Sequence, residues 1–269
     1  MSVKVSAKDL IESGAHYGHQ TRRWNPKMKK YIHGEQDGVH IFDLIQTKEL
    51  LEEALAAITE ASKKGKSILI VGTKKQAKEK VKEVAEKTGS FFINERWLGG
   101  IVTNFKQIQK SIKKLSEMRS KLASGEYKNR TKKERLLIQR EIDRLERFFG
   151  GISKLEAPPE MLVVIDIKRE IGAVKEGAMK DLDVVGIVDS NCDPNLVKYP
   201  VPMNDDATKA VEYVLDLIEE AIMLGKDKKS TAKKADKDTK KSDKKAKKTT
   251  KKSETKKPAK KSKSETKKK

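Results

Sequence analysis

The run Ser67-Ile-Leu-Ile-Val71, followed directly by Gly72-Thr-Lys-Lys-Gln76, indicates the architecture of the chain. A continuous apolar run of this length is typical of a strand covered on both faces, as strands in parallel sheets are. Gly72 turns the chain, and Thr73-Lys-Lys-Gln76 has the spacing of a capping box, so we expect a helix that begins there and ends near Gly89. A buried strand that leads into a helix is the repeating unit of layered α/β proteins.

The same alternation of strand and helix continues on both sides of this run. Before it, apolar residues recur at helical spacing from Thr47 until Gly65 stops the pattern. After it, we expect strands at 91–93, 161–165 and 184–188, a helix from about 170 to 180, and a last amphipathic helix from Ala207 to Ile222. Strands that alternate with helices pair in parallel through right-handed crossovers. Residues 1–103 and 151–224 are therefore predicted to form an α/β layered domain.

The first forty residues follow other patterns. Ser6-Ala-Lys-Asp9 predicts the start of a short helix that ends at about Gly14, because the Ser6 hydroxyl can accept from an N–H of the first turn. Residues 15–29 carry Gly, Pro, His and basic side chains without a sustained period, which predicts an ordered loop. Two short segments, 30–33 and 39–42, flank Gly34-Glu-Gln-Asp-Gly38 and predict a small β-hairpin.

Residues 104–150 interrupt the α/β alternation. Two sets of apolar residues follow three–four spacing, namely Phe105, Ile108, Ile112, Leu115 and Leu122, then Ile138, Ile142, Leu145 and Phe149. Between the sets, Gly125-Glu-Tyr-Lys-Asn-Arg130 predicts a turn and Thr131-Lys-Lys-Glu134 a second capping box. We therefore expect an inserted antiparallel coiled-coil hairpin that projects from the sheet domain. Its narrow apolar seam and charged faces suit contact with other large molecules better than enclosure of a small ligand.

Charge is distributed very unevenly along the 269 residues. Residues 225–269 hold 22 Lys against 6 acidic residues, a net charge of +16, so residues 1–224 carry only +5 of the total +21. This tail has no aliphatic residue larger than Ala and no aromatic residue, so it cannot bury enough apolar surface to offset its conformational entropy. We expect a disordered Lys-rich tail that attracts polyanions through counterion release. A solubilising tail without a fixed partner is the alternative.

Cysteine usage and hydropathy limit the class of protein. A lone Cys192 excludes a disulfide framework and agrees with a reducing cytoplasm. The first residues contain no apolar stretch of signal-peptide length, and no run of about 18 apolar residues occurs anywhere in the chain. We therefore expect a soluble intracellular protein that makes no use of a membrane.

The turn at Gly72 lies where α/β proteins hold phosphate groups, between a strand and a helix. It lacks the additional glycines that let a backbone approach a nucleotide closely, so we expect no nucleotide cofactor there. Lys74 and Lys75, near the predicted helix N-terminus, are candidates for contact with a nucleic-acid phosphate. An α/β enzyme that uses this loop remains an alternative.

Other candidate chemistry is weaker. The four histidines, His16, His19, His33 and His40, lie within 25 residues, but they offer one close pair and no nearby cysteine, so we expect no metal. Asp166 and Asp189 follow two predicted strands, where α/β enzymes place catalytic carboxylates. Asp189-Ser-Asn-Cys-Asp-Pro194 has no histidine nearby to activate its thiol, and these residue types equally form turns and caps. We predict no catalytic residue.

The most pronounced nucleic-acid signal is the segment Gln20-Thr-Arg-Arg-Trp-Asn-Pro-Lys-Met-Lys-Lys30. Its cations, Arg22, Arg23, Lys27, Lys29 and Lys30, can pair with phosphates, and Trp24 offers a flat surface for a base or sugar. The alternative is a solvated basic loop with Trp24 packed in the core. In Asn94-Glu-Arg-Trp-Leu-Gly-Gly100, Trp97 is predicted to be a packing anchor, whereas Arg96, and Asn104 beyond this stretch, can face outward.

Several of these stretches together resemble the bacterial ribosomal protein S2 family. The resemblance rests on His16-Tyr-Gly-His-Gln-Thr-Arg-Arg-Trp-Asn-Pro-Lys-Met28, Gly72-Thr-Lys-Lys-Gln-Ala77, Arg96-Trp-Leu-Gly-Gly100 with Thr103-Asn104, and Val188-Asp-Ser-Asn-Cys-Asp-Pro194. It extends from about residue 5 to 225, with the motifs in the order of the family.

The resemblance implies a flavodoxin-like α/β domain with an inserted coiled-coil hairpin and no enzymatic activity. It implies a ribosome-bound protein of the cytoplasm that contacts small-subunit rRNA and other small-subunit proteins, and that helps to recruit the large mRNA-binding ribosomal protein made of repeated OB-folds. An RNA-facing role is carried over to the matching positions, which are Arg22, Arg23, Asn25, Lys27, Lys74, Lys75 and Arg96.

The Lys-rich extension departs from many members of the family, which end soon after the last helix, so its role cannot be taken from them. We hypothesise that it follows rRNA or contacts a neighbouring protein. Two other function classes stay open at this point. One is the α/β enzyme that uses the Gly72 loop, and the other is an RNA- or DNA-binding regulator that acts outside the ribosome.

Overall fold

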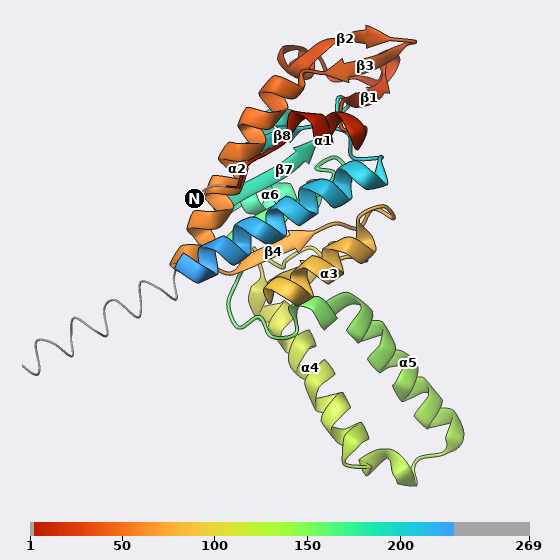
Figure 1. Ribbon diagram of the computed structural model, residues 1–269. Helices are drawn as coiled ribbons and strands as arrows, with labels where there is room; N and C mark the ends of the chain where they lie inside the picture. Colours follow the sequence, from red (N-terminus) through yellow and green to blue (C-terminus); the bar gives the residue numbers. More distant parts are fainter. Residues whose placement is uncertain (1–2, 229–269) are drawn as a thin grey trace, which may run out of the picture. The chain divides into compact units, whose positions relative to one another are not determined.

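A computed structural model describes residues 3–228. Its centre is a five-stranded parallel sheet with the strand order β5-β4-β6-β7-β8 (Figure 1). The strands are β4 (Ile68–Val71), β5 (Phe91–Ile93), β6 (Met161–Val164), β7 (Asp183–Val188) and β8 (Tyr199–Pro202). Numbered within this sheet, the order is 2-1-3-4-5, which is the order of flavodoxin-like folds. The predicted parallel α/β architecture is confirmed.

Alternate residues of the strands enter two separate cores. On β4, Ile68 and Ile70 belong to one hydrophobic cluster, whereas Leu69 and Val71 belong to the other. This follows from the two-residue period of a strand, which sends successive side chains to opposite faces. A run that is apolar throughout therefore requires helices or further layers on both faces, as the uninterrupted sequence of β4 predicts.

Helices from both ends of the chain cover the first face. The first cluster includes side chains from α1 (Ala7–Glu12), α2 (Leu44–Lys64), α3 (Lys78–Thr88) and a last helix over residues 208–228. α1 begins at Ser6, whose hydroxyl accepts from the Asp9 N–H as predicted. The last helix continues past position 225, where the Lys-rich tail was predicted to begin. From residue 229 onward, that tail lies outside the described residues.

The second face is covered by α6 (Ile171–Met179) and by the base of an inserted pair of helices. This pair is α4 (Phe105–Ala123) and α5 (Lys132–Phe149), joined through the 3-10 turn η3 (Glu126–Asn129) and followed by η4 (Gly150–Ile152). The predicted capping box is present, because the Thr131 and Glu134 side chains each accept from the other's backbone N–H.

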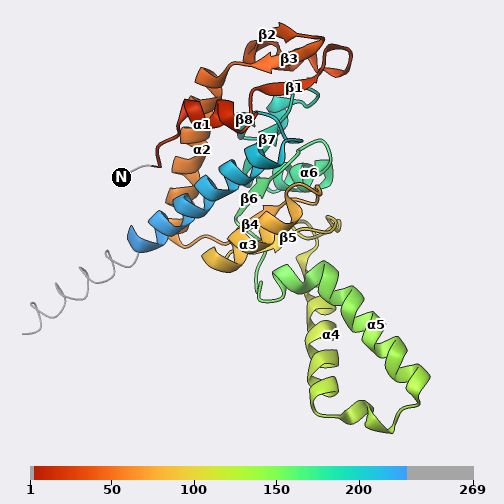
Figure 2. The ribbon, with the colours of Figure 1, turned by 45° about the vertical axis from the view of Figure 1, so that its right-hand side comes forward.

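The inserted helices pack on each other near their base and diverge toward the η3 turn (Figures 1 and 2). Ile112, Leu115 and Ile142 are buried in the second cluster. Farther out, Leu122 and Leu137 are 43% and 54% exposed, so the apolar seam is closed along part of its length. The predicted helical hairpin is confirmed, and its basal apolar residues are buried in the second cluster. Coiled-coil packing along its whole length stays a prediction.

A small antiparallel sheet with the order β1-β3-β2 precedes α2. Its strands are β1 (Tyr17–Gln20), β2 (Ile32–Gln36) and β3 (Val39–Phe42). The predicted hairpin is confirmed as β2 and β3. The prediction of a loop over residues 15–29 is wrong in part, because β1 pairs with β3 and two 3-10 helices follow, η1 (Thr21–Arg23) and η2 (Pro26–Tyr31).

Two further predictions about the large sheet need correction. Thr73 does not cap a helix, because its hydroxyl is bonded to the buried Glu170 carboxylate and accepts from Arg169 Nε, and α3 begins only at Lys78. Strand β8 was not predicted, since its sequence Tyr-Pro-Val-Pro contains two prolines. These are tolerated because β8 is an edge strand that pairs with β7 alone. None of the helices of residues 3–228 is long and apolar enough to cross a membrane.

Candidate nucleic-acid interface

The loop that follows β7 holds the cationic segment 20–30 in place. The backbone N–H of His19 donates to Ser190 Oγ at 2.8 Å, and the Asn25 N–H donates to the Ser190 carbonyl oxygen, also at 2.8 Å. A Cβ atom at Gly18 would lie 2.9 Å from Ser190 Oγ, so the close approach of these two segments requires glycine. Two motifs separated by about 170 residues in the sequence thus form one structural unit.

Six of the eight predicted RNA-binding cations are exposed and form no ion pair within residues 3–228. These residues, the exposed cations, are Arg22, Arg23, Lys29, Lys30, Lys75 and Arg96. Two of them make local contacts that leave the charge in solvent: Arg22 Nε donates to Gln20, and Lys30 Nζ lies 4.6 Å from the ring centre of Tyr31. Cations without an internal partner can neutralise phosphates without breaking a bond of the fold.

Three other predicted residues of the segment act within the fold. Lys27 Nζ lies 2.6 Å from Asp193 Oδ2, and the Asn25 side chain caps η2 by accepting from the Lys27 N–H. Trp24 is half-buried, and its ring centre lies 5.1 Å from that of the buried His40. These contacts fix the backbone that carries the exposed cations.

Lys74 lies in a different environment from its neighbour Lys75. Its ammonium group is 2.7 Å from Asp205, 2.6 Å from Asp206 and 3.7 Å from Asp166, and its side chain is only 12% exposed. Burial opposes the charge, but hydrogen bonds to Asp205 and Asp206 outweigh it, and the pKa of Lys74 is raised. A phosphate that approached Lys74 would meet these carboxylates first, so the structure engages this lysine internally.

The carboxylates around Lys74 repel one another. Burial, followed by the charges of Asp189 and Asp166, raises the pKa of Asp205 to about 7. Asp189 is buried and accepts from the Ser190 and Asp205 N–H groups. These acids stand at the carboxyl edge of the parallel sheet, the place where α/β folds gather polar side chains.

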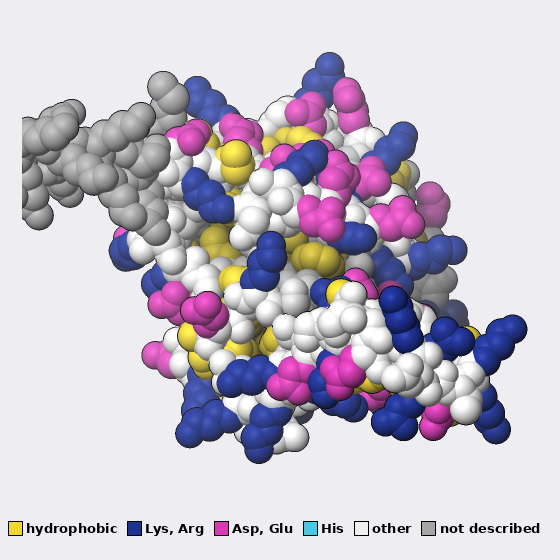
Figure 3. Space-filling model, turned by 90° about the horizontal axis from the view of Figure 1, so that it is seen from below, with side chains coloured by type: hydrophobic (Ala, Val, Ile, Leu, Met, Phe, Trp, Pro, Cys, Tyr) yellow, Lys and Arg dark blue, Asp and Glu magenta, His cyan; other side chains and the backbone are white. Residues whose placement is uncertain are grey.

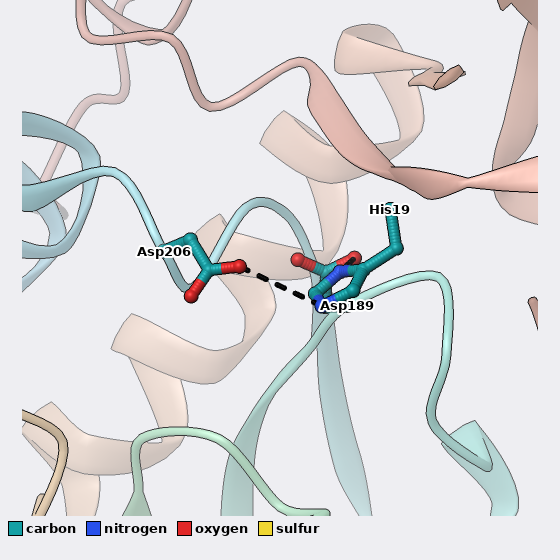
Figure 4. A group of neighbouring side chains, drawn as sticks. All are labelled: His19, Asp189 and Asp206. Carbon is teal, nitrogen blue, oxygen red and sulfur yellow. Dashed lines mark ion pairs between the residues drawn. The ribbon is translucent and has the colours of Figure 1, made fainter. Parts of the chain in front are cut away.

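One group of side chains at this edge could hold a divalent cation. His19 Nδ1 is 2.9 Å from Asp189 Oδ1, His19 Nε2 is 3.6 Å from Asp206 Oδ2, and the ligand atoms of the three residues lie within 4.8 Å of one another (Figure 4). The hydrogen bond to Asp189 raises the pKa of His19. Of the four histidines, only His19 belongs to this group within residues 3–228. The expectation that the chain binds no metal stays a prediction.

The residues weighed for catalysis have structural roles. Asp166 adopts a left-handed backbone conformation (φ 64°), and its carboxylate accepts from the Lys168 and Arg169 N–H groups, which stabilises the turn after β6. Cys192 is buried, and burial together with the charge of Asp205 raises the pKa of its thiol to about 12. A thiol in this state is a poor nucleophile.

The turn after β4 is closely packed at Gly72. A Cβ atom at Gly72 would lie 2.9 Å from Val81 Cγ2 and 3.3 Å from both Ala77 and Ile165. Gly72 is therefore needed for close packing of α3 on the sheet. Thr73 in this loop is bonded to Glu170, whereas Lys75 points into solvent. The expectation of no nucleotide cofactor stays a prediction.

A buried carboxylate that the sequence analysis did not identify organises the loop between Arg96 and Asn104. Glu176 Oε1 accepts from Trp97 Nε1 at 3.0 Å and from the Gly100 N–H at 2.8 Å. Its Oε2 accepts from the Val102 and Thr103 N–H groups and from the Thr103 hydroxyl, at 3.0–3.1 Å. Burial works against ionisation, but these donors prevail and the pKa of Glu176 is lowered. Trp97 is thus a packing anchor, as predicted.

The surface of the molecule is predominantly basic around the inserted helices. Seen from the hairpin side, Lys and Arg side chains surround the face, with Asp and Glu interspersed among them (Figure 3). Several acids are neutralised locally, for example Glu141 by Lys114 at 3.0 Å and Glu146 by Arg119. The fold and the site together define a basic α/β protein with exposed cations on a rigid frame.

Comparison with known proteins agrees with this description. The family model of ribosomal protein S2 matches residues 10–225. The chain is 43% identical over 223 residues to the small ribosomal subunit protein uS2 of Coprothermobacter proteolyticus, and the match covers 83% of each chain. The class is that of structural ribosomal proteins, which perform no enzymatic reaction. The chain belongs to the ribosomal protein S2 family.

Proposed function

We propose that the chain binds small-subunit rRNA through the exposed cations, and that the sheet domain acts as the rigid support for them. Membership of the family gives the chain a structural role in the small ribosomal subunit, with rRNA and other ribosomal proteins as partners. The assignment of RNA contact to Arg22, Arg23, Lys29, Lys30, Lys75 and Arg96 is our proposal.

The observation that carries this proposal is the contrast between paired and unpaired cations. Lys27 and Lys74 are held by carboxylates of the same chain, whereas the exposed cations have no such partner within residues 3–228. A phosphate that contacts an unpaired cation adds a favourable interaction. At Lys27 and Lys74, a phosphate would have to displace the carboxylate that already pairs with the lysine. Asn25 and Trp24 then serve chiefly to hold the segment, while Asn104 remains available to RNA.

The proposal also covers a protein partner and a location in the cell. The resemblance of the sequence motifs to those of bacterial family members supports a role in recruiting the large OB-fold-repeat mRNA-binding protein, and hence a ribosome-bound place in the cytoplasm. A direct test is to measure how much of that large protein remains on small subunits that lack this chain, before and after the purified chain is added back.

The test of RNA contact uses small subunits depleted of this protein and the purified full-length chain. The double variant Arg22→Ala/Arg23→Ala removes two exposed cations and no ion pair. Loss of two phosphate contacts should reduce the slope of log K against log salt by about 1.4–1.8, because each contact contributes about 0.7–0.9. Binding is measured by filter retention between low and moderate salt.

The matched control is Lys64→Ala/Lys82→Ala, which removes the same charge from exposed lysines that pair with Glu60 and Glu86 on their own helices. It should leave the salt slope close to that of the wild type. Equal slopes for the two double variants would show that net charge, and not the cationic segment, drives binding, and would refute the proposal.

A further inference from the structure

A hollow of about 580 Å³ lies where α4 begins, at the base of the hairpin. This volume falls within the range of about 300–1,000 Å³ that is typical of ligand sites. Its lining is mainly apolar, with Val102, Phe105, Pro158 and Leu182 contributed by three separate segments of the chain. We call this hollow the hairpin-base pocket.

One wall of the hairpin-base pocket is rigid before any ligand binds. The backbone of Val102 and Thr103 is held by Glu176 Oε2, and Gly100, which adopts φ 100°, is held by Oε1. A carboxylate that accepts several hydrogen bonds fixes the loop, so little conformational entropy is lost when a ligand contacts it.

Three polar side chains at the rim, those of Asn104, Lys106 and Lys180, form no hydrogen bond or ion pair within residues 3–228. The Asn104 N–H donates to the Gly100 carbonyl oxygen at 2.8 Å, but the Asn104 carboxamide forms no hydrogen bond within residues 3–228. Lys106 and Lys180 are exposed and form no ion pair in the described part of the chain. The carboxylate of Glu160, which also lines the pocket, accepts from the Ser67 N–H at 3.0 Å.

An apolar floor, a free carboxamide and two free ammonium groups match the parts of a nucleotide. A base can stack on the apolar floor, a carboxamide can both donate to and accept from a base edge, and lysines pair with the flanking phosphates. An apolar peptide would cover the same floor but would leave both lysines without a counter-charge.

We propose that the hairpin-base pocket receives one unpaired nucleotide of the rRNA. The base lies against Phe105 and Pro158, Asn104 contacts the base edge, and Lys106 and Lys180 contact the adjacent phosphates. This proposal rests on the proposed function, since it requires RNA at the surface of the protein, but it concerns a site separate from the cationic segment 20–30.

The test is ultraviolet cross-linking of intact small subunits, followed by digestion and mass spectrometry. Trypsin releases residues 97–106 as one peptide, because it cleaves after Arg96 and after Lys106. A nucleotide adduct on this peptide, located by its fragments to residues 102–105, is the expected result. If this peptide is unmodified while peptides from 20–30 carry nucleotides, the pocket proposal is overturned and the proposed function stands. Adducts on no peptide of the chain would overturn both.

Variants of the pocket residues distinguish a nucleotide bound in the pocket from RNA that only lies near it. Asn104→Ala, and separately Lys106→Ala/Lys180→Ala, should each lower the adduct yield at residues 102–105 by about fivefold, as expected for the loss of a hydrogen bond or charge pair at a fixed site. The yield is read on the tryptic peptide 97–106, or on 97–110 in the variant that lacks Lys106. The control is Lys110→Ala, an exposed lysine one turn farther along α4 that does not line the pocket, and its yield should not change. Equal yields in all variants, or a lysine-reactive cross-link from Lys106 to another protein in place of RNA, would overturn the proposal.

Discussion

Replacing Glu176 with alanine should destabilise the fold more than any change to a surface charge. The side chain is only 9% exposed and accepts five hydrogen bonds from the loop at 97–103. Val102 is buried, so its N–H would be left without a partner, at a cost of about 1–3 kcal/mol. The other donors lie in partly exposed parts of the loop and can regain water, so each adds less.

The unpaired Val102 N–H and the weaker losses at the other donors together predict that Glu176→Ala lowers the free energy of unfolding by about 3–4 kcal/mol. For a domain of this size that corresponds to a fall in Tm of about 6–16 °C, at roughly 2–4 °C per kcal/mol. Urea unfolding, followed by circular dichroism and tryptophan fluorescence, measures it. The control is Glu212→Ala, an exposed glutamate on the last helix, which should change the unfolding free energy by less than about 0.5 kcal/mol.

The pH dependence gives a second check on the same residue. Because the pKa of Glu176 is lowered in the folded state, its stabilisation is present above its unfolded pKa of about 4.3 and is lost as pH falls through the folded value. Glu176→Gln keeps the shape but cannot titrate, so the stability gap between it and the wild type should narrow on acidification below about pH 4.3. If the unfolding free energy of Glu176→Ala lies within about 0.5 kcal/mol of that of the wild type, the Glu176 carboxylate does not hold the loop.

Three further outcomes are expected. A Cβ atom at Gly151 would overlap the Phe92 carbonyl oxygen, so Gly151→Ala should lower the unfolding free energy by about 1–3 kcal/mol. The control Gly150→Ala, whose Cβ would lie 3.7 Å from Glu146, should lower it little. Equal melting temperatures of the two variants would contradict this prediction. The Cys192 thiol, with its pKa raised to about 12, should resist a disulfide reagent at pH 8 in the native protein and react in denaturant; rapid native labelling would show that it is accessible. Truncation after residue 228 removes most of the Lys-rich tail and should lower both the affinity for small subunits and its salt dependence; unchanged binding would leave the tail without this role.

The elements that the sequence predicted well are those specified by local patterns. The apolar run of β4, the stop at Gly65 and the capping box at Thr131 each depend on neighbouring residues, and all three are observed. Strand β8 carries no such pattern, because Pro200 and Pro202 are residues that local rules exclude from strands. They are tolerated because β8 lies at the edge of the sheet, which the local sequence does not reveal.

The candidate site was predicted by residue type but not by pairing. Glu176 lies 73–79 residues from the donors it accepts from, and Lys74 lies 131 residues from Asp205, so no local pattern could place these groups together. The same limit explains why Lys74 and Lys75 looked equivalent in the sequence, although the folded chain surrounds one with carboxylates and leaves the other in solvent.

We propose that cations on the α/β domain attach this chain to the small subunit. Sedimentation of cell extracts through sucrose gradients at increasing salt measures this attachment, with the wild-type chain and the Arg22→Ala/Arg23→Ala variant followed in parallel. We expect the wild type to sediment with the small subunit and the variant to dissociate at lower salt. A wild-type chain that stays at the top of the gradient at every salt concentration would show that the chain does not bind the small subunit.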